Sequence, residues 1–144
     1  MPHIEIQRRL EAPAERVFQA WSEPEQMERW FFAGHRASKV TNDFRVGGSY
    51  RVAMIESDSG NDHTHSGIYK EIVPHRKIAF TWSNHLVEDT LVTLTLEAKG
   101  EATLMTLRHD FFADEEKAVM HNLGWNGCLD HLETLISGKV SAQI

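Results

Sequence analysis

Hydrophobic and polar positions alternate along the start of the chain and through most of its middle. Ile4, Ile6 and Leu10 share one face of residues 3–10, which predicts a strand with one buried side. The alternation returns in three later runs, whose inward-facing residues would be Ile78, Phe80 and Trp82, then Val92, Leu94 and Leu96, then Met105, Leu107, His109 and Phe111. We therefore expect a first strand and about six more strands later in the chain.

Turn sequences separate these runs. Gly47-Gly48 between residues 44–46 and 50–52 predicts a hairpin, and the polar residues 57–62 predict a second turn before a strand near His63. Because short turns join consecutive strands, the sheet should be antiparallel.

Helical patterns occupy two places. Pro13 begins a short helix, and residues 22–25 have the spacing of a capping box that begins a second one. After Asp114 as N-cap, a long helix should run to Ser137, with its apolar positions at Trp125, Leu129, Leu132 and Ile136.

Two glycines inside the predicted long helix, Gly124 and Gly127, would each destabilise it by about 1 kcal/mol relative to alanine. Two explanations are open. Either the sheet approaches the helix closely there, or the missing side chains leave space for a ligand beside Trp125.

Length and composition limit the classes of protein. The chain has 144 residues, of which 41% are hydrophobic, so we expect one domain over residues 1–144. A net charge of −6 disfavours nucleic acid as a partner. One cysteine, no visible signal peptide and no apolar run of about 20 residues indicate a cytoplasmic protein without membrane insertion.

Several short sequences resemble a known family in the same order along the chain. They are Ala12-Pro13 with Val17-Phe18, Trp21 and Trp30, then DFRVGGSYR at 43–51, GIYKEIVP at 67–74, IAFTW at 78–82, and Gly124-Trp125 with Cys128, Leu129, Asp130 and Leu132. Together they resemble the START-like (SRPBCC) superfamily, in particular the group named after the C-terminal domain of the activator of the heat-shock-protein ATPase.

The resemblance implies an α+β helix-grip fold. A curved antiparallel sheet of six or seven strands would wrap around the long C-terminal helix, with two short helices after the first strand. It also implies a cavity between sheet and helix that holds an apolar or aromatic small molecule. Many relatives have a second Trp followed by Gly-Pro after Trp30, whereas this chain has Phe31-Phe32-Ala33-Gly34. The resemblance therefore carries no ligand identity.

Aromatic and apolar residues are the candidates for contacting such a ligand, because flat rings with a few polar groups suit small-molecule sites. Each single ring could equally be ordinary core. The expected ligand contacts are Phe32, Met54, Tyr69, Trp82, His109, Phe111, Trp125 and Leu129.

Chemistry at this site would depend on His109 or Tyr69 as a proton-transfer group, although a hydrogen-bonded core role for His109 is an open alternative. His63 and His65 would point the same way from one strand, but two ligands do not complete a metal site. We expect no metal and no cofactor.

Three functions are therefore compared. The leading one is binding of a hydrophobic or aromatic small molecule, with no reaction assigned. The second is a cyclase-, aromatase- or hydrolase-like enzyme that uses the same cavity. The third is a chaperone-associated interaction module, and a homodimer is left open.

Overall fold

The computed structural model describes residues 2–31, 37–55, 63–84 and 86–137. The described elements, in chain order, are β1 (Ile4–Leu10), α1 (Ala14–Ser22), α2 (Pro24–Trp30), β2 (Ala37–Asn42), β3 (Ser49–Ile55), β4 (His63–Val73), β5 (Lys77–Trp82), β6 (Thr90–Lys99), β7 (Ala102–Asp110) and α3 (Glu115–Ser137). This order confirms the strand, two short helices, run of strands and long helix that the sequence predicts.

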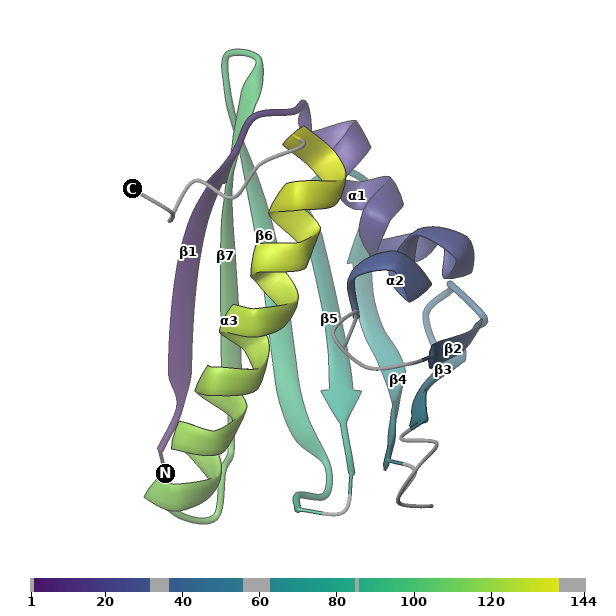
Figure 1. Cartoon of the computed structure of the whole chain (residues 1–144), viewed down its shortest axis with the longest axis vertical. Coiled ribbons are helices and arrows are strands. Elements are labelled where there is room, and N and C mark those ends of the chain that lie inside the picture. The colour runs from purple at the N-terminus through teal and green to yellow at the C-terminus, as the bar shows by residue number, and fades with distance from the viewer. Residues whose placement is uncertain (1, 32–36, 56–62, 85, 138–144) are drawn as a thin grey trace.

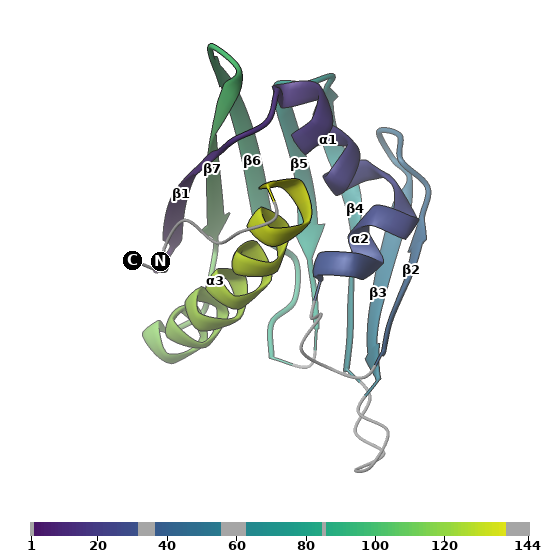
Figure 2. The same cartoon turned by 45° about the horizontal axis from the view of Figure 1, so that its top comes forward.

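The strands form one antiparallel sheet in the order β1-β7-β6-β5-β4-β3-β2. Strands β2 to β7 follow one another as a meander, and β1 joins the far edge beside β7, with Ile4 opposite His109. The curved sheet wraps around α3, while α1 and α2 cover its other part (Figures 1 and 2). The expected α+β helix-grip fold is confirmed.

The core lies between the sheet and α3. Val92 and Leu94 of β6 and Leu107 of β7 have no exposed surface, and neither have Leu129 and Leu132 of α3. The helix face that the sequence assigns to the core is therefore the buried one. Among the described residues, none of the helices is both long and apolar enough to cross a membrane.

The long helix begins as predicted. The backbone N–H of Lys117 donates to Oδ1 of Asp114 at 3.0 Å, which is the N-cap hydrogen bond. Hydrogen bonds from Lys117 also lower the pKa of the Asp114 carboxyl. Pro13 occupies the N-cap of α1.

The first predicted hairpin lies where expected, but its first strand is earlier. Residues 44–46 are not a strand, because β2 ends at Asn42 and residues 43–48 form the turn. Gly47 has φ +85°, and its N–H donates to the carbonyl of Tyr69 at 2.9 Å. This left-handed residue explains why the turn needs glycine.

Gly67 of β4 allows a close approach of two strands. A side chain there would collide with the carbonyl oxygen of Thr81 on β5. The same oxygen accepts a hydrogen bond from the hydroxyl of Tyr50 at 2.5 Å. Gly67 thus lets three neighbouring strands close around one carbonyl group.

A buried ion pair fastens α3 to the edge strand β1. Arg8 lies on the inward face of β1, and its guanidinium donates to Asp130 at 2.9 Å, Glu133 at 3.1 Å and the side chain of Asn126 at 2.9 Å. The Glu133 side chain is 2% exposed and that of Arg8 12% exposed. The contact therefore lies largely out of water.

The two helix glycines face outward. Gly124 and Gly127 are both exposed, and a Cβ added at either would meet no atom of the described chain within 4 Å. Both explanations given from the sequence are therefore wrong for the described chain, because no strand lies against these positions and the open space is on the exposed face of α3, not beside the buried Trp125.

Candidate functional site

Aromatic side chains from most elements meet between the sheet and the helices. They come from α1, α2 and the residue after it, β3, β4, β5 and α3. Each is at most 4% exposed. We call these eight residues the aromatic cluster: Trp21, Trp30, Phe31, Tyr50, Tyr69, Phe80, Trp82 and Trp125.

Phe31 is the central ring of the aromatic cluster. It stacks on Trp30 with ring centroids 3.9 Å apart. Its centroid lies 6.0 Å from Trp21, 6.4 Å from Trp82 and 5.9 Å from Trp125. Phe31 directly follows α2 and belongs to no strand.

One small cavity remains beside these rings. It is lined by Trp21, Met27, Phe31, Tyr50, Tyr69 and Phe80, and it leaves about 10 Å³ for the centre of a water molecule. That is room for one water. A larger guest in this cavity would require at least one lining ring to move, and none of the lining side chains is charged.

The two tyrosine hydroxyls are committed as donors. Tyr69 donates to Oδ1 of Asn42 at 2.7 Å, and the Asn42 amide donates to the carbonyl of Ser22 at 2.7 Å. Tyr50 donates to Thr81, as described above. Burial raises the pKa of both tyrosines, so both are neutral near pH 7. Because a raised pKa makes the deprotonated form rarer, Tyr69 is poorly suited to act as a general base.

Of the four indole N–H groups, two have a hydrogen-bond acceptor and two do not. Trp30 donates to the carbonyl of Ala20 at 2.8 Å, and Trp125 donates to Nδ1 of His109 at 3.0 Å. The Nε1 atoms of Trp21 and Trp82 are buried and have no hydrogen-bond partner within the described part of the chain. An unpaired buried donor is costly, typically about 1–3 kcal/mol.

His109 has both ring nitrogens engaged. Nδ1 accepts the Trp125 N–H, and Nε2 lies 2.7 Å from Oγ1 of Thr90. The Thr90 hydroxyl donates to the carbonyl of Trp82 at 2.6 Å, so it has to accept from His109. These contacts fix His109 as the neutral tautomer with its proton on Nε2.

The surroundings of His109 keep it uncharged. Burial, and secondarily the neighbouring His121, lower its pKa to about 3. A second proton on Nδ1 would also point at the Trp125 N–H. The lone pair that a general base needs is therefore occupied, and the geometry favours the core role that orients Trp125.

We expect acid to destabilise the fold through His109. The unfolded chain takes up a proton at a pKa near 6.5, whereas the folded chain takes it up only near pH 3. As pH falls from 6.5 towards 3, the unfolded state gains protons first, so the free energy of unfolding falls by about 1.4 kcal/mol per pH unit. His109→Gln should flatten this slope by about one proton in denaturant titrations at several pH values.

The control for that result is the imidazole NMR signal of His109 itself. It should not titrate between about pH 4 and 7, unlike a solvent-exposed histidine. A titration of His109 near pH 6.5 would contradict the assigned hydrogen-bond chain.

Asn84 joins two further histidines beside His109. Its Oδ1 accepts the backbone N–H groups of Leu86 and Val87, so its amide nitrogen is the donor. That nitrogen lies 3.1 Å from Nδ1 of His65 and 3.1 Å from Nε2 of His121. One side-chain amide thus connects β4, the segment after β5 and α3.

The structure brings together most of the residues expected to contact a ligand. Tyr69, Trp82 and Trp125 are in the aromatic cluster, His109 contacts Trp125, and Leu129 is fully buried in the adjoining core. Met54 lies on β3, with a side chain outside the described part, and Phe32 lies outside the described residues.

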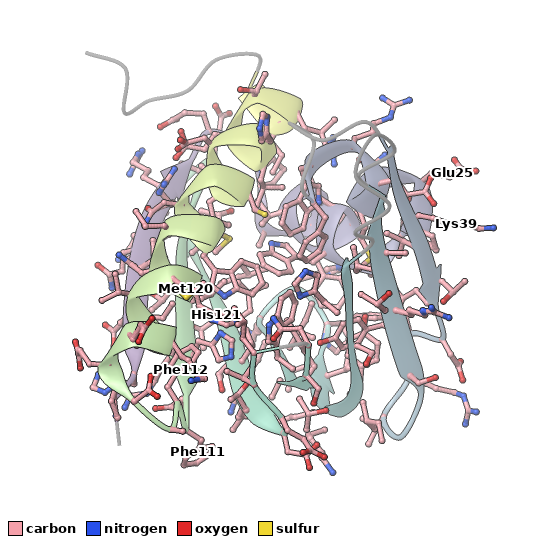
Figure 3. The ribbon with its side chains drawn as sticks, turned by 60° about the horizontal axis from the view of Figure 1, so that its bottom comes forward. Glu25, Lys39, Phe111, Phe112, Met120 and His121 are labelled. Carbon is pink, nitrogen blue, oxygen red and sulfur yellow. The ribbon has the colours of Figure 1, made fainter. Side chains whose placement is uncertain are left out.

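Phe111 is a correction. Strand alternation places it inward with His109, but β7 ends at Asp110 and Phe111 has φ +75°. This left-handed residue turns its side chain outward, where it is 55% exposed, and Phe112 is buried instead. Figure 3 shows Phe111 at the outer end of the fold, with Phe112 between it and His121. The rings of Phe112 and His109 lie 4.4 Å apart.

The histidines form no metal site in the part of the chain that the structure describes, where no three metal-ligating side chains gather. His65 is buried and stacks on Trp82 with centroids 4.8 Å apart. His63 lies on the same strand, but its side chain is outside the described part.

The sequence patterns did not single out Asn84, Thr90 or His121, and Phe31 stood out only as an apolar residue of the second short helix, where the chain departs from its relatives. Phe80 had a usable signal, because it alternates with Trp82 on one strand face. The polar residues had no such signal in the sequence, because their hydrogen-bond partners come from distant segments and no local pattern predicts those contacts.

Residues 11–137 match the family described as Activator of Hsp90 ATPase homolog 1-like protein. No curated protein matches the sequence of this chain.

Three solved structures are similar to the chain over nearly its whole length. Protein CV1439 from Chromobacterium violaceum is 29% identical with a TM-score of 0.85, covering 94% of this chain and 98% of that one. CalU16 from Micromonospora echinospora is 30% identical with a TM-score of 0.74, covering 94% and 76%. An AHSA1-like protein from Aeromonas hydrophila, at 20% identity, a TM-score of 0.80 and coverage of 95% and 93%, shares the fold.

Proposed function

Because the chain belongs to the family of activator of Hsp90 ATPase homolog 1-like proteins, a START-like helix-grip family, we propose that it binds an apolar or aromatic small molecule inside the aromatic cluster. One observation carries the proposal. Eight buried rings gather between the sheet and the helices, and five of them line a small cavity that has no charged side chain in its lining. Apolar walls with a few polar groups are the usual composition of a small-molecule site.

Phe31 explains how a closed cluster can admit a guest. Its ring occupies the centre of the cluster, in contact with Trp30. A ligand of similar size would take the place of this ring, and the cavity beside it would add to the available space. Phe31 would then move from the end of α2, and the strands would stay as they are.

We expect indane, a small apolar bicyclic hydrocarbon, to raise the melting temperature saturably. Ligand that binds only the native state stabilises it by mass action. Phe31→Ala should bind indane at least about tenfold more tightly, because the guest no longer displaces a buried phenyl ring worth about 1.5–3 kcal/mol. Thermal unfolding at increasing indane concentration measures both.

The matched control is Phe112→Ala, which removes an equally buried phenyl ring outside the cluster. It should leave indane affinity near that of the unsubstituted chain. If indane stabilises neither the unsubstituted chain nor Phe31→Ala up to its solubility, the proposal fails. An equal gain in Phe112→Ala would indicate unspecific filling of any new hole and would count against it as well.

The alternative functions have less support. A cyclase-, aromatase- or hydrolase-like enzyme would need His109 or Tyr69 to exchange protons near pH 7, whereas the His109 pKa is lowered to about 3 and burial raises that of Tyr69. An interaction module of the chaperone machinery draws only on the family's name. The sequence has one cysteine, the buried Cys128, which is compatible with the reducing cytoplasm as the location of the proposed binding function.

A further inference from the structure

Two of the four indole N–H groups lack an acceptor, and this difference indicates which polar group the ligand has. Trp30 and Trp125 donate to protein acceptors, whereas Trp21 and Trp82 have buried N–H groups without a partner in the described chain. Buried donors are almost always paired in folded proteins, so two orphans in one apolar cluster are informative. Trp21 is 2% exposed and also lines the small cavity.

We propose that the ligand carries a neutral carbonyl oxygen that accepts the Nε1 proton of Trp21. This inference rests on the proposed binding function and adds the chemical class of the ligand, an uncharged apolar ketone or quinone. The bound carbonyl would pair a donor that the fold leaves unpaired, so the ligand gains a hydrogen bond without breaking one within the protein.

The lining of the cavity excludes charged ligands. None of its six residues is charged, so a carboxylate would lose its hydration without gaining a counterion. An ammonium group would lose its hydration without gaining an anionic partner, since the lining holds no carboxylate. A neutral acceptor is the polar group that these surroundings match.

Trp21 is a better partner than Trp82 because of its position. The Trp21 side chain forms part of the cavity wall, and that of Trp82 does not. Both lie around Phe31, at centroid distances of 6.0 Å and 6.4 Å. The two side chains therefore provide the same chemical group near Phe31, and only that of Trp21 belongs to a side chain that lines the cavity.

The test compares 1-indanone with indane, two molecules of the same ring system that differ by a carbonyl group. We expect the unsubstituted chain to bind 1-indanone about two- to tenfold more tightly, the value of one net hydrogen bond. The protonated amine 1-aminoindane should bind at least about tenfold more weakly than indane, because a cation must be desolvated without a partner. Melting-temperature shifts or calorimetric titration give the three affinities.

Trp21→Phe removes the donor and keeps an aromatic wall, so it should abolish the preference for 1-indanone. Trp82→Phe is the matched control, since it removes the same orphan group away from the cavity, and the preference should persist. If Trp82→Phe abolishes the preference and Trp21→Phe does not, the assignment to Trp21 is overturned.

A measurement on the unsubstituted chain covers the case in which Trp21→Phe does not fold. The carbonyl stretch of bound 1-indanone should lie at lower frequency than in an apolar solvent, as a hydrogen-bonded carbonyl does. An unshifted band contradicts the inference. Equal binding of indane and 1-indanone overturns the inference alone, whereas binding of neither overturns the proposed function and this inference with it.

Discussion

Leu129→Ala is expected to lower the free energy of unfolding by about 2–5 kcal/mol. Leu129 has no exposed surface and lies on the face of α3 that packs against the sheet. Truncation removes buried methyl groups and leaves a hole that the surrounding core fills only in part, and such losses in tightly packed interiors have this size. Urea or guanidinium unfolding, followed by far-ultraviolet circular dichroism, gives the change.

Lys117→Ala is the control for Leu129→Ala on the same helix. Its ammonium group pairs with Asp114, whose side chain is 50% exposed, so the substitution should change stability by less than about 1 kcal/mol. The N-cap hydrogen bond uses the backbone N–H of residue 117 and is kept. Equal denaturation midpoints for the two variants would refute the assigned core face of α3.

Arg8→Met should destabilise the protein by about 3–5 kcal/mol. The substitution keeps much of the apolar stem but leaves the Glu133 carboxylate, 2% exposed, without the guanidinium of Arg8. Removing one partner of a buried ion pair typically has this effect, because the remaining charge stays out of water. Chemical unfolding at neutral pH measures the loss.

Arg9→Met is the matched control on the neighbouring residue. Arg9 pairs with Glu11, and the two side chains are 59% and 60% exposed. Arg9→Met should therefore lower the free energy of unfolding by less than about 1 kcal/mol. Adding Glu133→Leu to Arg8→Met should recover part of the stability, since it removes the buried carboxylate that faced Arg8. Equal losses for Arg8→Met and Arg9→Met would show that the ion pair beneath α3 contributes little.

Elements with a strong local pattern could be predicted from the sequence. The alternation of β5, β6 and β7 and the apolar spacing of α3 reflect burial of one face, which local sequence records directly. Strand β2 could not be predicted, because Val40 is its one large apolar residue and lies beside the exposed Lys39. Short edge strands are commonly polar, so their sequences resemble loops.

The same alternation is correct along β1 and wrong just after β7. Ile4, Ile6 and Leu10 were correctly assigned to the inward face, and strict alternation puts Arg8 there as well, although its charge suggests the surface. Only the carboxylates of α3 explain its position. The prediction for Phe111 was wrong because its left-handed backbone angle turns its side chain outward and leaves Phe112 in the core.

The polar part of the candidate site could not be predicted, because its contacts join distant segments. Trp125 and His109 could each be proposed from position alone, but the chain of hydrogen bonds through Thr90 could not. Asn84 likewise contacts His121 from a position 37 residues earlier. Such pairs depend on the register of strands and on the rotation of α3.

The position of β1 has a consequence for how the chain assembles as it is synthesised. Strands β2 to β7 can pair one after another as each leaves the ribosome, because every neighbour is the next strand in sequence. Strand β1 is made before all of them, yet its register places Ile4 opposite His109 of β7. Its apolar side chains must wait for that distant partner, and closing so long a loop slows folding. Of the seven described strands, β1 is therefore made first and paired last.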